Sequence, residues 1–168
     1  MATGRTEGRL HPALTSTGPG TSPGATPAAT AVDVAGIAGE TAILTLEGEM
    51  PLRHLLPVDR LLTRGSGIAR LTGLMRVRAD AALVRFCARS LGQGRPESDV
   101  LLGPGTRVLI RDWRAGALWG MPSAMVPAAR LADGCYIRRE PLGPVDLLLP
   151  QIDRPGVIYA GGLEIGLP

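Results

Sequence analysis

The sequence predicts an all-β domain. From residue 42 to the end of the chain, short apolar runs are interrupted every few residues by glycine or proline, as is typical of strands and tight turns. Glycine occurs 23 times and proline 15 times in the 168 residues. Apolar residues make up 45% of the chain, which is sufficient for the core of one domain. We therefore expect roughly ten short strands and hardly any helix.

The first 35 residues are expected to form a disordered leader. This segment is rich in Thr, Ala, Gly and Pro (TSTGPGTSPGATPAAT) and contains no aromatic residue. It can bury too little apolar surface to offset the entropy that ordering would cost. We therefore divide the chain into a leader, residues 1–35, and one domain, residues 36–168. His11 lies in the leader and is expected to be solvated.

The domain is expected to begin with a hairpin, a helical turn and a strand. The segment AILTLEGEM predicts a strand, a turn at Glu47 and Gly48, and a returning strand. Apolar spacing in LRHLL predicts a single helical turn that Pro57 ends, and RLLTR predicts the next strand. His54, within that turn, is expected to be a half-exposed packing or hydrogen-bonding residue.

The middle of the domain is expected to hold two strands and then a strand pair. IARLTGLMRVRA and AALVRFCA predict two strands after the GSG turn. The clearest pair is predicted in VLLGPGTRVLIRDW, where apolar runs at 100–102 and 107–110 flank a Gly-Pro-Gly-Thr turn. Trp113 and Trp119, on opposite sides of Gly116, are expected to pack across strands in the core.

The C-terminal part is expected to contain three more strands. LADGCYIRRE predicts a turn at Asp133 and Gly134 that leads into a strand. VDLLLPQI and the following GVIYAGG predict two antiparallel strands joined across residues 153–156.

Composition argues against several classes of function. All 18 basic residues are arginines scattered along the chain and only 3% of residues are aromatic, so the clustered cations and stacking platforms of a nucleic-acid binder are missing. Cys87 and Cys135 form neither a CxxC motif nor a Cys/His cluster, so we predict two small buried or half-buried residues and no metal site, cofactor or disulfide. No membrane-spanning run or signal-peptide core is visible. The expected location is therefore cytoplasmic, with non-classical export as the alternative.

Four segments, in this order, resemble the Hint (hedgehog/intein) domain family of the bacterial type. They are ETAILTLEGEMPLRHLLPVDRLLTRGSG, DVLLGPGTRVLIRD, MVPAARLADGCYIRREP and LLLPQIDRPGVIYAGGLEIGLP. The resemblance covers residues 36–168 and implies a horseshoe-like all-β fold of short strands, built from two pseudo-symmetric β units.

The resemblance also implies a chemistry that this chain lacks the residues to perform. Hint domains use a Cys, Ser or Thr at the start of the domain to attack the preceding peptide carbonyl, and a histidine in a second block to protonate the leaving amide nitrogen. Gly36 falls on the nucleophile position, Thr106 on that of the histidine, and Leu149 on that of a later histidine. Neither threonine nor leucine protonates an amide nitrogen near neutral pH.

Three interpretations of function follow. The first is a catalytically degenerate Hint domain that is not an enzyme and serves as a structural or interaction domain, its partner unknown and a protein being one candidate. The second is an active autoprocessing domain with a non-standard nucleophile, for which the candidate site residues are Thr41 and Thr106. The third is an unrelated β-rich binding module with a pocket lined by Trp113 and Trp119. The remaining polar candidates are interpreted as turn and surface residues: Asp59, Thr63, Asp153 and Arg154.

Overall fold

The computed structural model describes residues 33–168, and strands are the main regular structure of this part of the chain. The strands are β1 (Ala42–Thr45), β2 (Gly48–Pro51), β3 (Arg60–Thr63), β4 (Gly67–Ala81), β5 (Val84–Phe86), β6 (Val100–Leu102), β7 (Arg107–Ile110), β8 (Ala124–Pro127), β9 (Ile137–Arg139), β10 (Gly143–Ile152), β11 (Gly156–Ala160) and β12 (Leu163–Leu167). The helices are α1 (Trp113–Trp119) and two 3-10 turns, η1 (Leu52–His54) and η2 (Ala128–Leu131). The predicted all-β fold class is confirmed.

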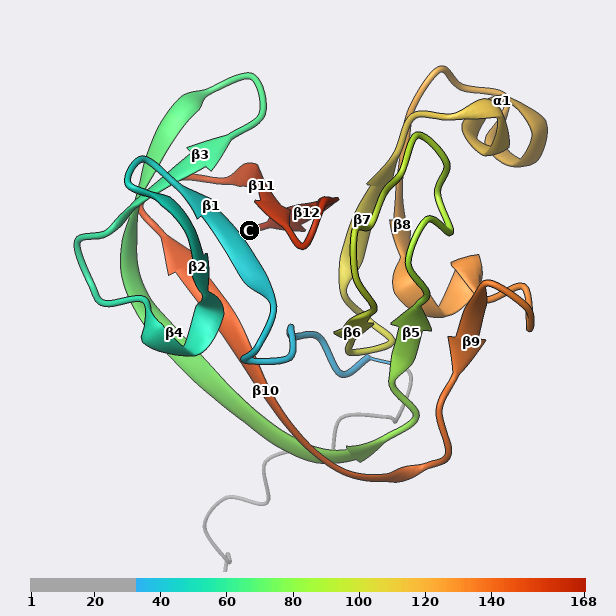
Figure 1. Ribbon diagram of the computed structural model, residues 1–168, viewed down its shortest axis with the longest axis horizontal. Helices are drawn as coiled ribbons and strands as arrows, with labels where there is room; N and C mark the ends of the chain where they lie inside the picture. The colour runs from blue at the N-terminus through green and yellow to red at the C-terminus, as the bar shows by residue number, and fades with distance from the viewer. Residues whose placement is uncertain (1–32) are drawn as a thin grey trace, which may run out of the picture.

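A long two-stranded ribbon connects the two ends of the molecule. Strands β4 and β10 pair in antiparallel fashion from Ala81 opposite Gly143 to Leu71 opposite Ile152, with a bulge near Ile152. They run side by side along the base of Figure 1, with β1, β2 and β3 at one end and β5, β6 and β9 at the other. This arrangement gives the open horseshoe that the sequence predicted.

The strands form two sheets. The larger has nine strands in the order β10-β4-β3-β1-β11-β12-β7-β8, with β2 paired to β1, and the smaller has the order β6-β5-β9. The first four residues of β4 pair with β3 and the stretch from Leu71 to Ala81 pairs with β10, so the ribbon continues directly from the larger sheet. The single helical turn predicted before Pro57 is present as η1, and the strand predicted after it is β3.

Two predicted hairpins are wrong, although their strands are present. Strands β6 and β7 do not pair with each other, because β6 pairs with β5 while β7 pairs with β8 and β12. Likewise β10 pairs with β4, and β11 pairs with β12. In both cases the intervening loop carries the chain from one partner strand to another instead of folding it back on itself.

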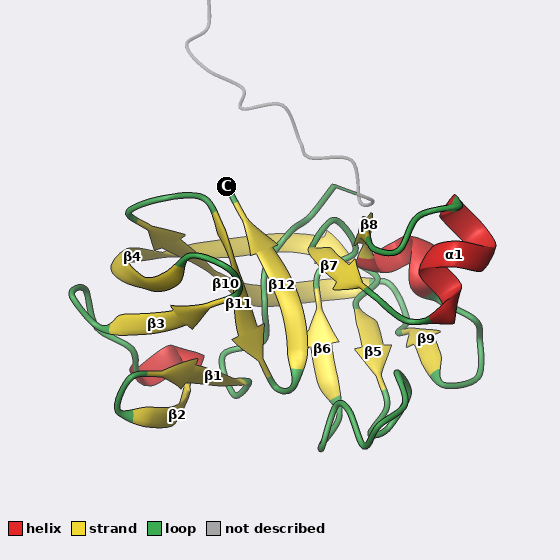
Figure 2. Cartoon of the chain, turned by 90° about the horizontal axis from the view of Figure 1, so that it is seen from above, coloured by secondary structure: helices red, strands yellow, loops and turns green. Residues whose placement is uncertain are grey.

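Helix α1 replaces the strand and turn that the sequence predicted around Gly116. The Asp112 carboxylate caps the helix by accepting a hydrogen bond from Arg114 N at 2.9 Å, and Gly120 ends it in the left-handed conformation at φ 65°. Trp113 is 74% exposed whereas Trp119 packs partly buried against the core, so the expected cross-strand packing of the two indoles is wrong. Figure 2 shows α1 at the edge of the molecule.

The segment 34–38 crosses between the two sheets and is the strap that joins them. Ile37 bridges to Leu102 of β6 on one side and to Leu148 of β10 on the other. Further backbone bonds tie Gly103 N to Gly36 O at 2.8 Å and Gly105 N to Val34 O at 2.9 Å. The strap is therefore held by backbone hydrogen bonds along its whole length.

The strap also contributes to the core at both of its ends. Ile37 is fully buried in the main cluster, which includes Leu61 and Ile158 of the larger sheet and Leu102 of the smaller one. Val34 is 2% exposed and forms a second cluster with Ala81 and Leu147. Residues 33–35 of the predicted leader thus belong to the described structure. Residues 1–32, including His11, lie outside it, and the disorder of the leader stays a prediction.

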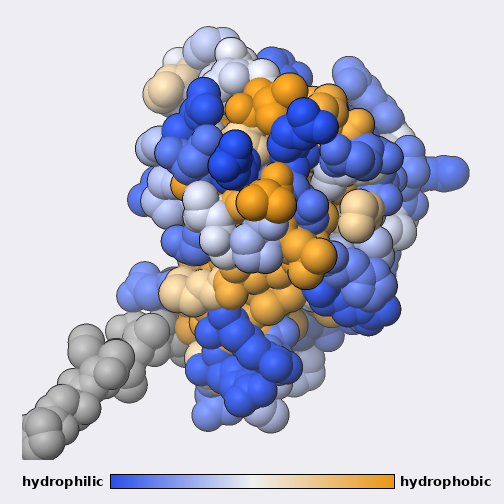
Figure 3. Space-filling view, turned by 90° about the vertical axis from the view of Figure 1, so that its left-hand side faces the viewer, coloured by the Kyte–Doolittle hydropathy of each residue, from blue (hydrophilic) through white to orange (hydrophobic). Residues whose placement is uncertain are grey.

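One end of the molecule exposes apolar side chains. Figure 3 faces the end at which β1, β2 and β3 lie and shows apolar side chains gathered between charged ones. The large apolar residues exposed in this part of the chain are Leu46, Leu56, Val58, Ile68 and Met75.

Close contact with the strap makes Gly105 a position where a side chain is costly. A Cβ on Gly105 would lie 2.7 Å from the carbonyl oxygen of Asp33, and this backbone oxygen cannot move independently. We expect Gly105→Ala to lower the free energy of unfolding by about 1–3 kcal/mol. Gly116→Ala is the matched control, because nothing lies within 4 Å of its Cβ, and it should raise stability by up to about 1 kcal/mol. Urea unfolding of both variants measures this, and equal stabilities would contradict the close approach.

Candidate functional site

Gly36 and Thr106 lie in direct contact although 70 residues separate them. The Gly36 N–H donates to Thr106 Oγ1 at 3.0 Å, and the Thr106 hydroxyl donates to Gly36 O at 2.9 Å. One hydroxyl can both accept and donate, so a single side chain satisfies both groups. Thr106 is 2% exposed and Gly36 is buried, so the two bonds are shielded from water.

Local structure at each residue explains how they meet. Thr106 directly precedes β7 and follows the two glycines at 103 and 105, whose missing side chains let the strap approach the loop. Gly36 directly precedes Ile37, which is fixed between β6 and β10. The strap thus places the amide nitrogen of Gly36 opposite the Thr106 hydroxyl.

A side chain at position 36 has no room. A Cβ built on Gly36 would lie 2.7 Å from Leu147 Cβ, and Gly36 has φ +153°, which side-chain-bearing residues rarely adopt. A cysteine or serine at this position would require β10 or the strap to shift.

A mostly apolar cleft of about 540 Å³ opens beside this contact. Thr106 and Leu149 both line it, so two of the positions singled out by the sequence meet at one cavity. Arg107 is the only charged side chain among its lining residues, and no histidine, cysteine or carboxylate side chain is among them. The lining residues are Ala35, Gly105, Thr106, Arg107, Met125, Leu149, Pro155, Gly156, Val157, Gly166, Leu167 and Pro168.

Thr41 lies at the entry to β1, away from this contact. Its N–H donates to Ala38 O at 3.0 Å, and its carbonyl accepts from Leu52 N at 2.9 Å. Within residues 33–168, no hydrogen bond joins the Thr41 side chain to Gly36 or Thr106. The structure therefore brings Thr106 to Gly36 but does not bring Thr41 to either.

His54, the one histidine of the described chain, is exposed on η1. It is more exposed than the half-exposed position expected from the sequence, and its Nε2 accepts a hydrogen bond from Arg53 Nε at 3.0 Å. It does not line the cleft beside Thr106.

The other polar candidates bind neighbouring turn groups. Asp59 accepts from Leu56 N at 2.8 Å, and the Thr63 and Ser66 hydroxyls are 3.1 Å apart. Asp153 pairs with Arg154 and also accepts a hydrogen bond from the backbone N–H of Arg70. The hydrogen bond from Arg154, followed by that backbone bond, holds the pKa of Asp153 below its ordinary value.

No group of ligands suited to a metal ion occurs in residues 33–168. Clusters of three or more His, Cys, Asp or Glu side chains are absent from this part of the chain. Cys87 is half-buried and Cys135 is exposed, and both are free thiols, so the expectation of a buried or half-buried position is wrong for Cys135. In the same residues, no helix has the length and apolarity to cross a membrane.

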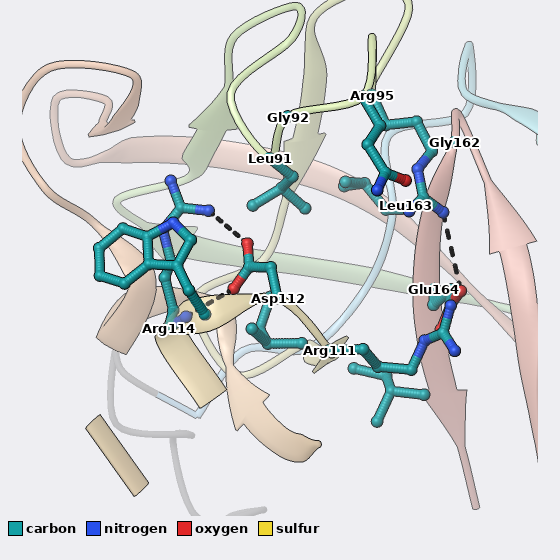
Figure 4. Close-up of a pocket in the computed structure, with 13 residues that line it drawn as sticks. Leu91, Gly92, Arg95, Arg111, Asp112, Arg114, Gly162, Leu163 and Glu164 are labelled. Carbon is teal, nitrogen blue, oxygen red and sulfur yellow. Dashed lines mark hydrogen bonds and ion pairs between the residues drawn. The ribbon is translucent and has the colours of Figure 1, made fainter. Parts of the chain in front are cut away.

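Sequence reasoning missed a second cavity, of about 460 Å³, at the end of β7 and the start of β12, opposite the ends of these strands that line the first cleft. Trp113 lines this cavity but Trp119 does not, so the prediction of one pocket lined by both tryptophans is wrong. Figure 4 shows Arg95, Arg111 and Glu164 at this cavity, which reach it from a loop, from the end of β7 and from β12. Residues so far apart in the chain give no local pattern by which the cavity could have been found.

The comparisons with known proteins agree with this fold. A family model described as "Hint domain" matches residues 36–165. The structure is similar to that of the Ssp DnaB mini-intein variant M86, with a TM-score of 0.54, 10% identity, and coverage of 80% of this chain and 96% of the intein. It is also similar to the MchDnaB-1 intein variant N145AA, with a TM-score of 0.51, 13% identity, and coverage of 79% and 99%. A search of curated protein sequences found no match.

We expect the hydroxyl group of Thr106 to contribute more to the free energy of unfolding than its methyl group does. In Thr106→Val the Gly36 N–H stays buried without its side-chain partner, which costs about 1–3 kcal/mol. Thr106→Ser keeps the hydroxyl and loses one buried methyl, worth about 0.8 kcal/mol. We therefore expect the serine variant to unfold at a higher urea concentration than the valine variant. The opposite order would show that the two hydrogen bonds contribute little.

Proposed function

Because this chain belongs to the Hint domain family, we propose that it is a Hint domain that does not cleave its own chain and that serves as a structural or interaction domain. The reciprocal hydrogen bonds between Gly36 and Thr106 are the observation that carries this proposal. They lie at the two positions to which the resemblance assigns the family's nucleophile and its acid.

Thr106 contacts the atom that the acid would have to protonate. In the family's reaction the amide nitrogen at the nucleophile position becomes the leaving group and takes up a proton. Here the Gly36 N–H donates to Thr106 Oγ1, so the hydroxyl acts as the acceptor at that nitrogen. A neutral hydroxyl is far too weak an acid to deliver a proton there near pH 7. The contact therefore holds the unreacted amide in place.

Position 36 has no nucleophilic side chain and no room for one. Glycine at 36 offers no thiol or hydroxyl, and its Cβ position lies 2.7 Å from Leu147 Cβ. Thr41, the nearest hydroxyl along the chain after Gly36, is fixed at the entry to β1 by Ala38 and Leu52. Hydroxyl nucleophiles need a general base, and His54 is on the exposed surface of η1.

An unreactive scaffold remains suited to binding or to a structural role. Residues 33–168 form a continuous fold: the strap bridges β6 and β10, β4 pairs with β10 along the ribbon, and the buried apolar residues form one main core. The cleft beside Thr106 is lined mainly by apolar groups, which suits noncovalent contact with an apolar group better than acid–base chemistry. These features support a domain that keeps the family's shape without its reaction.

The purified chain should stay intact. We expect the intact mass to remain that of residues 1–168 after long incubation at neutral pH, with or without added thiol or hydroxylamine, because these reagents release a chain only from a thioester or ester. An intein that forms its thioester, treated in parallel, is the positive control. Loss of a mass that corresponds to residues 1–40, abolished by Thr41→Ala, would overturn the proposal and make Thr41 the nucleophile.

Restoring the thiol alone should not restore the reaction. We expect Gly36→Cys to lower stability by about 1–3 kcal/mol, because its side chain meets Leu147. Hydroxylamine should release no fragment from it, since Thr106 still supplies no acid. Gly116→Cys, with open space around the new side chain, is the control for adding a thiol. A fragment beginning at residue 36 would show that only the nucleophile is missing.

A further inference from the structure

Three arginines from distant parts of the chain converge on one buried carboxylate, that of Glu164. Glu164 is 6% exposed, and its Oε1 lies 3.1 Å from Arg64 Nη1 and 3.8 Å from Arg95 Nη1. Arg111 Nε lies 3.2 Å from the other oxygen, Oε2. A single carboxylate faces three guanidiniums, so the cluster has a formal surplus of two positive charges.

Two of these arginines have unused hydrogen-bond donors. Oε2 of Glu164 accepts no hydrogen bond from the described residues, so Arg111 holds it as an ion pair whose N–H is not aimed at the oxygen. Neither Arg95 nor Arg111 donates a side-chain hydrogen bond within residues 33–168, whereas Arg64 donates one to Oε1. Each of the two guanidiniums therefore has N–H groups free for a ligand.

Both guanidiniums line the cavity of about 460 Å³ shown in Figure 4. Leu91 and Leu109 form apolar parts of its wall, and the exposed indole of Trp113 lies at the same cavity. Asp112 and Arg114 also line it, but they neutralise each other through a contact of 2.6 Å between Nη1 and Oδ2. The positive surplus of the cavity thus comes from the cluster around Glu164.

We infer that this cavity binds a carboxylate carried by an apolar group, as found at the C-terminal residue of a polypeptide or in a small acylated amino acid. Arginine forks match the two oxygens of a carboxylate, and each such bond is charge-assisted. The leucine and tryptophan side chains would contact the apolar part of the ligand. Glu164 acts as a positioning residue that keeps the guanidiniums together.

The inference rests on the interaction role proposed above but not on the loss of self-cleavage. The cavity and the cleft beside Thr106 share no lining residue. Binding is measured without reference to the mass of the chain, so each proposal can fail alone.

The test is calorimetric titration of the full chain with N-acetyl-L-leucine and with its C-terminal amide. We expect saturable binding of the acid with a Kd on the order of 1 mM, and binding of the amide weaker by about tenfold or more. Equal affinity for acid and amide, tighter binding of inorganic phosphate, or no saturable heat up to about 20 mM acid would each overturn the inference.

Two variants and a control locate the site. Arg111→Gln and Arg95→Gln should each weaken binding of the acid by about tenfold. Arg130→Gln removes an exposed arginine that does not line the cavity and should leave the affinity unchanged. Thermal midpoints establish that all three fold, and unchanged affinity in both cavity variants would overturn the assignment.

A peptide ending in leucine that binds at least tenfold tighter than N-acetyl-L-leucine points to a polypeptide ligand, and equal affinity points to the small acid.

Discussion

The rest of this structure depends on the strap at residues 34–38, which passes between the two sheets and is hydrogen-bonded to both. It bridges β6 and β10 through Ile37, and its carbonyl groups accept hydrogen bonds from Gly103 and Gly105 in the loop before β7. All of these hydrogen bonds join backbone N–H and C=O groups, which would be costly to bury without a partner. Because the loop at 103–105 is glycine-rich at the points of contact, the strap can approach it to hydrogen-bond distance.

The strap also fixes what can happen at Gly36. It sets the amide nitrogen of this residue against Thr106 and its Cα against Leu147, so the position is both hydrogen-bonded and sterically filled. In an active Hint domain the same place must admit a nucleophile and a proton donor. Here the same packing that joins the two sheets leaves no space for a side chain, so structural support and the proposed loss of reactivity have one physical origin.

Charge is distributed very differently at the two cavities of the molecule. The cleft beside Thr106 has one charged lining side chain, whereas the cavity at Glu164 gathers several arginines around one buried acid. A buried carboxylate is tolerated only with partners, and three guanidiniums more than neutralise its charge. The excess positive charge is the feature of this chain that most clearly points to a ligand.

The sequence by itself determined the fold class, most of the strands and the residue types at the positions that the resemblance assigns to the reaction. Short apolar runs between glycines and prolines specify strands locally, and a missing cysteine or histidine can be read directly from the chain. Helix α1 also had a local signal, an Asp112 cap and a Gly120 end, that the strand interpretation overlooked. The pairing of β1 with β2 was predicted from the turn between them. Only the tertiary structure decided the partners of β6, β7 and β10, because long-range contacts and not the following or preceding loops select them. For the same reason it alone placed Thr106 on Gly36 and brought Arg64, Arg95 and Arg111 to Glu164, since these contacts join residues far apart along the chain.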